Sequence, residues 1–277
     1  MATRNHRDRL LLVTWLLFLS ILTGLPPVAI SSEPEPGETI SIDGRISQEI
    51  EDFRDWIDNL PEAETTPPTS SLQNFEQQLE FWSQWKRSRS GLARGIQART
   101  GPEHPARQTV ETFFEQTTRA SELETELVMK KAVPGEDNRK AAEFASTLEE
   151  LLGAYENLLQ LADRLKQYEQ LELPAITTVY GPEQVEVQQG DTLVHTYMLE
   201  TTGAEPTEHL EARVEPTRDP NAGTFSVEMA GLDSIPADKA AVLRLQGRIE
   251  TAGPVLLRLV VEGSNLEKTK TIAIRGE

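Results

Sequence analysis

Residues 141–165 read AAEFASTLEELLGAYENLLQLADRL, and they carry the clearest structural pattern of the 277-residue chain. Their apolar side chains recur at alternating intervals of three and four residues, as on one face of a long helix. These residues are Ala141, Phe144, Leu148, Leu151, Tyr155, Leu158, Ala162 and Leu165. The pattern predicts an amphipathic helix with a heptad seam. Such a seam either packs inside the chain or mediates self-association.

Three more helical segments precede this one. Apolar residues at 46, 50, 53, 57 and 60 form one stripe, which Pro61 ends. A second stripe runs from Leu72 to Ile96 before Gly101-Pro102, and a third helix is expected over 105–133, before Pro134-Gly135. Long helices joined by short Pro/Gly breaks predict an elongated antiparallel helical bundle or coiled-coil hairpin, a stalk over 45–172.

The apolar period changes from 3.6 to 2 in residues 173–277. Apolar and polar residues alternate at 185–188, 193–199, 210–214 and 225–229, and turn residues such as Gly190-Asp191 separate these runs. Several short strands with turns at this spacing are typical of an Ig-like antiparallel β-sandwich. We therefore predict an α+β protein with separate domains, in which the helical bundle precedes the sandwich.

The C-terminal part also resembles a known group of modules. The stretch QVEVQQGDTLVHTYMLETTGAEPTEHLEARV at 184–214 is similar to bacterial and archaeal Ig-like modules of the CARDB and NEW3 type. Gly190-Asp191 and Ile235-Pro236-Ala237 match the turns of those modules, whereas Thr201-Thr202-Gly203 replaces the usual Asn-Thr-Gly and Asp238 replaces a glycine. The resemblance is confined to residues 173–277. It implies an extracytoplasmic spacer or binding module and transfers no functional residues.

The N-terminus has the pattern of an export signal. A basic start, Arg4 to Arg9, precedes a mostly apolar run at 10–25, and Ala29-Ile30-Ser31 fits a cleavage site. Residues 1–31 are therefore predicted to be a signal peptide or an uncleaved signal anchor, followed by a flexible acidic leader at 32–44. We expect an exported cell-envelope protein, periplasmic or extracellular, which an uncleaved anchor would tether.

Composition excludes several chemistries. The chain has 27 Lys+Arg against 45 Asp+Glu, a net charge of -18, so nucleic acid is not an expected partner. It has no cysteine and four histidines, and no Glu-x-x-His, His-Glu-x-x-His or Gly-x-Ser-x-Gly motif. We expect no catalytic residue, no cofactor and no metal site, and therefore a protein that is not an enzyme.

One basic stretch stands out in this acidic chain. FWSQWKRSRSGLARGIQAR, residues 81–99, contains no acidic residue. We predict a partner-binding surface there, which would dock an envelope protein or an anionic membrane surface. Its candidate residues are Phe81, Trp85, Lys86, Arg87, Arg89 and Arg94. In the alternative interpretation, this segment is a central helix whose arginines pair with glutamates of neighbouring helices.

The predicted function is therefore non-enzymatic. The helices would dock a partner, and the sandwich would act as a binding or spacer module. The alternative is a carbohydrate- or cell-wall-binding module on a helical stalk. Only Tyr180, Tyr197 and Phe225 are aromatic in the sandwich, and Tyr197 and Phe225 are expected to face inward, so stacking on sugars is hard to arrange.

Overall fold

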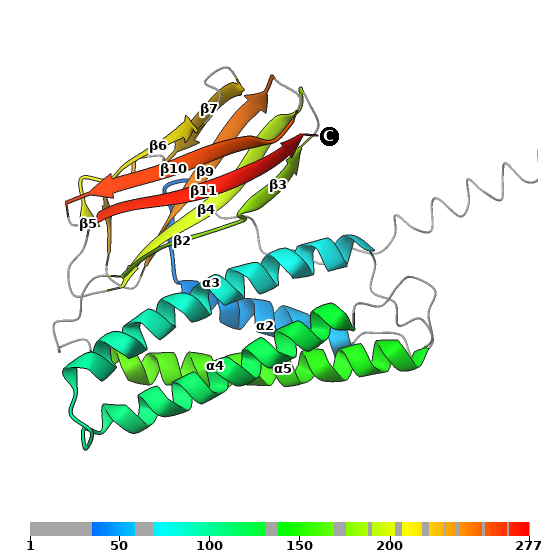
Figure 1. Ribbon diagram of the computed structural model, residues 1–277, viewed down its shortest axis with the longest axis vertical. Coiled ribbons are helices and arrows are strands. Elements are labelled where there is room, and N and C mark those ends of the chain that lie inside the picture. Colours follow the sequence, from blue (N-terminus) through cyan, green and yellow to red (C-terminus); the bar gives the residue numbers. More distant parts are fainter. Residues whose placement is uncertain are drawn as a thin grey trace, which may run out of the picture. The chain divides into compact units, whose positions relative to one another are not determined.

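A computed structural model describes residues 35–58, 69–130, 138–168, 176–187, 190–202, 207–217, 222–229, 231–236, 239–250, 253–264 and 266–276. The chain divides into Met1–Glu35 and the compact unit Pro36–Glu277. Helices come mainly before strands in the sequence, so the fold class is α+β as predicted (Figure 1). The expected signal peptide or anchor lies outside the described residues.

All four predicted helices are present. They are α2 (Ile42–Asp58), α3 (Thr69–Arg99), α4 (Ala106–Met129) and α5 (Asn138–Lys166). Pro105 directly precedes α4, where a missing backbone N–H costs little. Arg164 and Lys166 lie in the last turn of α5, where cations interact favourably with the helix dipole.

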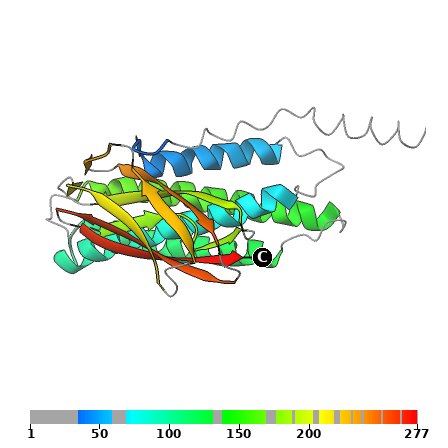
Figure 2. The same cartoon turned by 90° about the horizontal axis from the view of Figure 1, so that it is seen from above.

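The heptad seam of α5 is used inside the chain. Phe144, Leu148, Leu151, Tyr155 and Leu158 are buried in a core that all four helices share. The seam packs mainly against α4, and α2 also lies beside α5 (Figure 2). Neighbouring helices of the same chain therefore cover the seam, which is the packing inside the chain that the heptad spacing allowed.

The strands form two main sheets and one small ribbon. Their bounds are β1 (Thr39–Ile40), β2 (Ile176–Tyr180), β3 (Gln184–Val187), β4 (Thr192–Thr202), β5 (Thr207–Glu208), β6 (Glu211–Pro216), β7 (Gly223–Glu228), β8 (Ser234–Ile235), β9 (Ala240–Ile249), β10 (Val255–Gly263) and β11 (Leu266–Gly276). In the described residues, sheet A has the order β1-β9-β4-β2, with β7 also paired to β9. Sheet B has the order β3-β11-β10-β6, and β5 pairs with β8. The ladders are antiparallel except for β3 with β11.

The two sheets share one apolar core, which the period of two in the sequence explains. Alternate residues of β4 and β9, such as Leu193, Leu199 and Leu243, meet alternate residues of β10 and β11, such as Leu257 and Ile272. Tyr197 is buried in this core and Phe225 packs against it, so both aromatic rings face inward as predicted.

The ordered body begins earlier than the sequence indicated. We expected a flexible acidic leader at 32–44, but Thr39–Ile40 pairs with Ala240–Ala241 of β9, and α2 begins at Ile42. The backbone N–H of Gly37 also donates to the carbonyl of Val242 at 3.0 Å. Ile42 extends the apolar stripe of α2 by one turn before Ile46, and the burial of both residues fixes the segment.

The helices and sheets are not separate domains. Residues 45–172 and 173–277 were expected to fold separately, yet both belong to the compact unit Pro36–Glu277. The helix core continues into sheet A through Tyr180, Met198, Ala240 and Val242, and α3 packs on β2 (Figure 1). Both faces of this half of sheet A are therefore buried, one by sheet B and one by α3.

Candidate functional site

The structure divides the six predicted partner-binding residues of α3. Phe81, Trp85, Lys86 and Arg89 are buried, with at most 6% of each exposed. Arg87 and Arg94 are exposed. The predicted docking surface is therefore wrong for four of its six residues, because α3 lies between sheet A and the other helices. The alternative interpretation, a central helix whose cations pair with acidic neighbours, describes these four.

The aromatic residues of α3 hold α2 in place. The indole Nε1 of Trp82 donates to Glu49 at 2.6 Å, and that of Trp85 donates to Asp43 at 2.6 Å. Both indole rings pack on Tyr155 of α5, with ring centroids 4.7 and 6.1 Å apart. A buried indole N–H needs an acceptor, and here two carboxylates of α2 supply it.

Lys86 forms a buried polar contact between α3 and α4. Its Nζ donates to Ser121 Oγ and to both carboxylate oxygens of Glu124, all at 2.8 Å. The hydroxyl of Tyr155 donates to the same Glu124. Burial and the charge of Glu124 raise the pKa of Tyr155 well above its usual value, so this hydroxyl keeps its proton.

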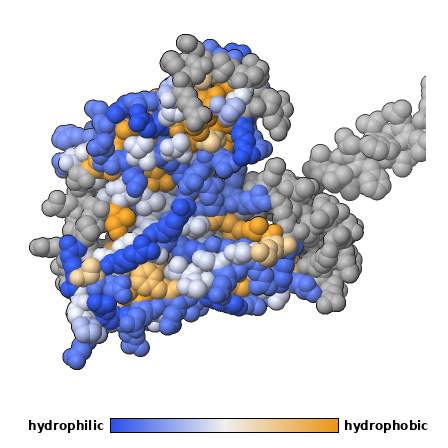
Figure 3. All heavy atoms as spheres, in the orientation of Figure 1, coloured by the Kyte–Doolittle hydropathy of each residue, from blue (hydrophilic) through white to orange (hydrophobic). Residues whose placement is uncertain are grey.

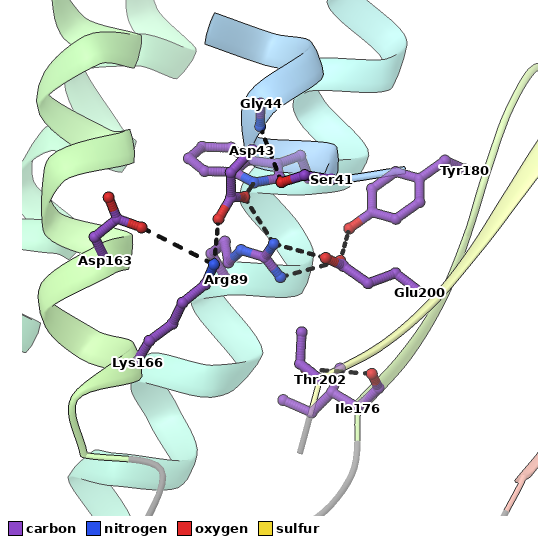
Figure 4. A network of polar contacts seen from close by, with 11 residues as sticks. Ser41, Asp43, Gly44, Arg89, Asp163, Lys166, Ile176, Tyr180, Glu200 and Thr202 are labelled. Carbon is purple, nitrogen blue, oxygen red and sulfur yellow. Dashed lines mark hydrogen bonds and ion pairs between the residues drawn. The ribbon is translucent and has the colours of Figure 1, made fainter. Parts of the chain in front are cut away.

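Arg89 is the centre of a polar network that joins α2, α3 and α5 to β2 and β4 (Figure 4). Its Nη1 and Nη2 donate to the two carboxylate oxygens of Glu200 in β4, at 3.0 and 2.8 Å. Nη2 also donates to Asp43 of α2 at 2.7 Å. Tyr180 of β2 donates its hydroxyl to Glu200 at 2.6 Å, and Lys166 of α5 donates to Asp43 at 2.6 Å. We call these five residues the Arg89 network.

Burial and neighbouring charges determine the protonation states of Arg89 and Tyr180 in the network. Burial disfavours a charged guanidinium, but Glu200 and Asp43 outweigh that cost and raise the pKa of Arg89. Burial also raises the pKa of Tyr180 well above its usual value, and Glu200 adds to the shift. Tyr180 therefore stays neutral and acts as a hydrogen-bond donor.

Asp43 is the acid that links the helices to each other. Burial alone would raise its pKa, but the charges of Arg89 and Lys166 outweigh burial and lower the pKa from 3.8 to about 2. Asp43 also lies in the first turn of α2, where the helix dipole favours an anion. It is therefore ionised at neutral pH and contacts both α3 and α5.

The Arg89 network is a joint between the helices and sheet A rather than a reaction centre. The side chains of Arg89 and Glu200 are 1% and 2% exposed, so a substrate cannot reach them without opening the interface. Their hydrogen bonds are directed at one another. Within the described part of the chain, no group of His, Asp and Glu residues could hold a metal ion.

A second contact places α3 on sheet A. The side-chain amide of Gln84 donates to the carbonyl of Gly181 and accepts from its N–H, both at 2.9 Å. Glu80, one turn earlier, accepts from the N–H of Glu183 at 3.0 Å. Gly181 and Glu183 lie in the turn after β2, so these hydrogen bonds fix the position of α3 at that end of the strand.

The sequence did not identify four of the five residues of the Arg89 network. Asp43 was assigned to the leader, and Lys166, Tyr180 and Glu200 were not selected. The spacing of Ile42, Ile46 and Ile50 continues the apolar stripe of α2, and it would have placed Asp43 on a helix. Glu200 was missed because both faces of β4 are buried there, so apolar and polar residues do not alternate along the strand as they do when one face is exposed.

Comparisons with known proteins identify no family. No protein-family model and no curated protein match the sequence. Solved structures with partial similarity include a family 123 glycoside hydrolase from Clostridium perfringens (14% identity, TM-score 0.26, 33% of this chain and 21% of that chain). Others are the secreted serine protease VesC from Vibrio cholerae (9%, 0.32, 42% and 26%) and a conjugative transposon lipoprotein from Bacteroides eggerthii (16%, 0.27, 36% and 96%). The chain thus spans about a quarter or less of the first two proteins. TM-scores this low establish no shared fold.

Among the described residues, no helix is both long and apolar enough to cross a membrane. Hydrophilic side chains cover much of their visible surface in Figure 3, with smaller apolar areas between them.

Proposed function

We propose that this chain is a non-enzymatic, exported cell-envelope protein that acts as a rigid adaptor. In this proposal α2–α5 is a helical bundle, β2–β11 is an Ig-like β-sandwich of the CARDB or NEW3 type, and both lie in the periplasm or outside the cell. The basic and apolar pattern of residues 4–25 supports export.

The observation that carries the proposal is the buried pairing of Arg89 with Glu200 and Asp43. These buried charged groups bond the helices to sheet A and thereby support a fixed orientation of the two parts. A fixed orientation pre-organises two surfaces for a partner, which lowers the entropy lost on binding. A fixed orientation would bring no such gain in binding to a protein whose sandwich is only a spacer.

The partner is an envelope protein or an anionic membrane surface, and it contacts the exposed side of α3. Arg87 and Arg94 are the predicted binding residues that remain exposed. They lie seven residues apart, two turns along one side of the helix, so a single acidic surface can contact both. Arg87 lies 4.0 Å from Glu183, which is in the turn between β2 and β3, so this surface of α3 adjoins that turn.

Cell fractionation followed by crosslinking tests this proposal with the full chain. We expect the protein in the envelope or secreted fraction, and a defined crosslinked partner or membrane association that Arg87→Ala/Arg94→Ala abolishes. Arg119→Ala is the matched control, because Arg119 is an exposed arginine of α4. A cytoplasmic protein, or equal loss with the control, would contradict the proposal.

A carbohydrate- or cell-wall-binding module is the second candidate function. Exposed hydroxyl and guanidinium groups on neighbouring strands of sheet A, those of Thr192, Thr224 and Arg248, favour it.

A further inference from the structure

The N-terminal end of the compact unit lies along one edge of β9. Thr39–Ile40 pairs with Ala240–Ala241, and two further backbone hydrogen bonds of 3.0 Å join residues 37 and 38 to Val242. β7 pairs with a longer part of the same edge, since β4 occupies the opposite edge. We call residues 36–43 the strap, because they run from β9 to the first turn of α2.

The strap ends in the Arg89 network (Figure 4). Only two residues separate β1 from Asp43, whose carboxylate accepts three hydrogen bonds from other helices. The donors are Trp85 and Arg89 of α3 and Lys166 of α5, at 2.6, 2.7 and 2.6 Å. One short segment therefore contacts the edge of sheet A and also both helices that Asp43 links.

The connection between β1 and Asp43 is short and stiff. The Oγ of Ser41 accepts a hydrogen bond from the N–H of Gly44 at 3.2 Å, which caps the first turn of α2. Ile42, between Ser41 and Asp43, is 1% exposed. Neighbouring Cα atoms are 3.8 Å apart, so Asp43 lies within about 11 Å of the last residue of β1. A displacement of β1 from β9 therefore moves Asp43 relative to its partners on α3 and α5.

The strap is held on β9 more weakly than the strand beside it. Its ladder with β9 contains two residue pairs, whereas the ladder of β7 with β9 contains six. Thr39 is exposed and Ile40 is half-buried. Segments with few buried contacts open at the lowest cost in free energy. We therefore expect β1 to leave β9 before β7 does.

Loss of the strap would remove partners from buried donors of the joint. With Asp43 withdrawn, the indole N–H of Trp85 loses its acceptor and Lys166 loses its 2.6 Å ion pair. Arg89 keeps Glu200 but loses its second carboxylate. Because a buried donor without an acceptor is costly, the seated strap stabilises the closed joint. By linkage, the closed joint also holds the strap in place.

We infer that the strap couples the N-terminal segment of the chain to the joint, so that lifting β1 from β9 loosens the helices on sheet A. The strap directly follows Met1–Glu35, the part of the chain that carries the export pattern. In a protein that keeps residues 1–31 as an anchor, tension on the anchor acts on the strap first. The inference goes beyond the adaptor proposal and needs neither of its binding residues, Arg87 and Arg94.

Hydrogen exchange of the full chain tests the coupling. Gly37→Pro weakens the strap, because Gly37 has a φ of 85° and donates its N–H to Val242, and proline permits neither. We expect exchange in the last turn of α5 to become about fivefold faster, the effect of one lost hydrogen bond. Gly190→Pro is the matched control, because Gly190 has a φ of 90° and donates its N–H to Ile249 at the other end of β9. It should leave exchange in the last turn of α5 unchanged.

A disulfide across β1 and β9 should produce the opposite change. The chain has no cysteine, and Thr39 and Ala241 are directly opposite each other, so Thr39→Cys/Ala241→Cys can form a single cross-strand disulfide. The oxidised variant should exchange more slowly in the last turn of α5 than its reduced form. Leu256→Cys/Ala273→Cys is the matched control, because it joins β10 to β11 in the same way. Its oxidation should leave exchange in α5 unchanged.

Three results would overturn the inference. The first is faster exchange in Gly37→Pro that is confined to the strap and the facing residues of β9, because the strap would then open without the joint. The second is an equal effect of Gly190→Pro on α5, and the third is unchanged exchange in α5 after oxidation of the disulfide across β1 and β9. None of these outcomes affects the adaptor proposal, whose test depends on Arg87, Arg94 and the cellular fraction.

Discussion

Arg89 of α3 and Glu200 of β4 are 111 residues apart in the sequence, yet they form two hydrogen bonds of 3.0 and 2.8 Å. Both side chains are almost fully buried. The desolvation of two charges makes such a pair a weak net stabiliser, but losing one member leaves an uncompensated buried charge. The pair therefore enforces the orientation of the helices on sheet A.

Glu200→Gln should destabilise the protein strongly. The substitution keeps the shape of the side chain but removes the charge that faces Arg89, so we expect a loss of about 3–5 kcal/mol in the free energy of unfolding. Chemical denaturation measures it. Glu215→Gln is the control, because Glu215 pairs with Arg213 and Arg258 on the exposed face of sheet B. There we expect a loss of about 1 kcal/mol or less. Equal losses would contradict the role of the joint.

Acid should weaken the joint through Asp43. Its pKa is about 2 in the folded protein against 3.8 as the reference, because Arg89 and Lys166 outweigh burial. The unfolded chain therefore takes up the proton first as the pH falls. The contribution of Asp43, about 2 kcal/mol, is complete above about pH 4 and is lost as the pH falls through about 2.

Asp43→Asn isolates this contribution. The variant has no titrating group at position 43, so it should be less stable than wild type at pH 6, and the difference should shrink between about pH 4 and pH 2. Denaturant midpoints across this range measure the effect. A difference that stays constant with pH would show that the charge of Asp43 is not what stabilises the joint.

The sequence predicted the elements better than their association. Leu148, Leu151 and Tyr155 repeat with the period of a helix, and Leu193, Tyr197 and Leu199 with that of a strand, because a single buried face produces each pattern. The packing of α3 on sheet A buries the second face of β2 and β4. Tyr180 and Glu200 then lose the alternation that would have identified them.

The candidate site was harder to predict for a related reason. A basic helix segment has the same sequence whether its cations face a partner or an internal carboxylate. Lys86 and Arg89 became internal because Glu124 and Glu200 approach from other elements, and these pairings depend on tertiary structure. Arg87 and Arg94 stayed exposed because they lie on the opposite side of α3 from this core.

The helices and sheets should unfold in a single transition. Trp56 lies in α2 and Trp82 and Trp85 lie in α3, so the fluorescence of these three reports the helical part, while hydrogen exchange in β10 and β11 reports sheet B. Because Arg89 and the shared core connect the two parts, we expect the same midpoint from both probes. Separate midpoints would show that the parts fold independently, as the sequence alone predicted.

Gly181→Ala should loosen the contact between α3 and the turn that follows β2. Gly181 has a φ of 133°, and a Cβ there would lie 2.5 Å from Cδ1 of Tyr197, so either the backbone or the buried ring must move. The amide bonds between Gly181 and Gln84 would be displaced with it. We expect a loss of about 2 kcal/mol or more, measured as a lower denaturation midpoint.

Gly153→Ala in α5 is the control, because a Cβ there meets nothing within 4 Å. It should stabilise the helix by up to about 1 kcal/mol. If both variants changed the midpoint in the same direction, the close packing of Tyr197 against Gly181 would not be what positions α3 on the sheet.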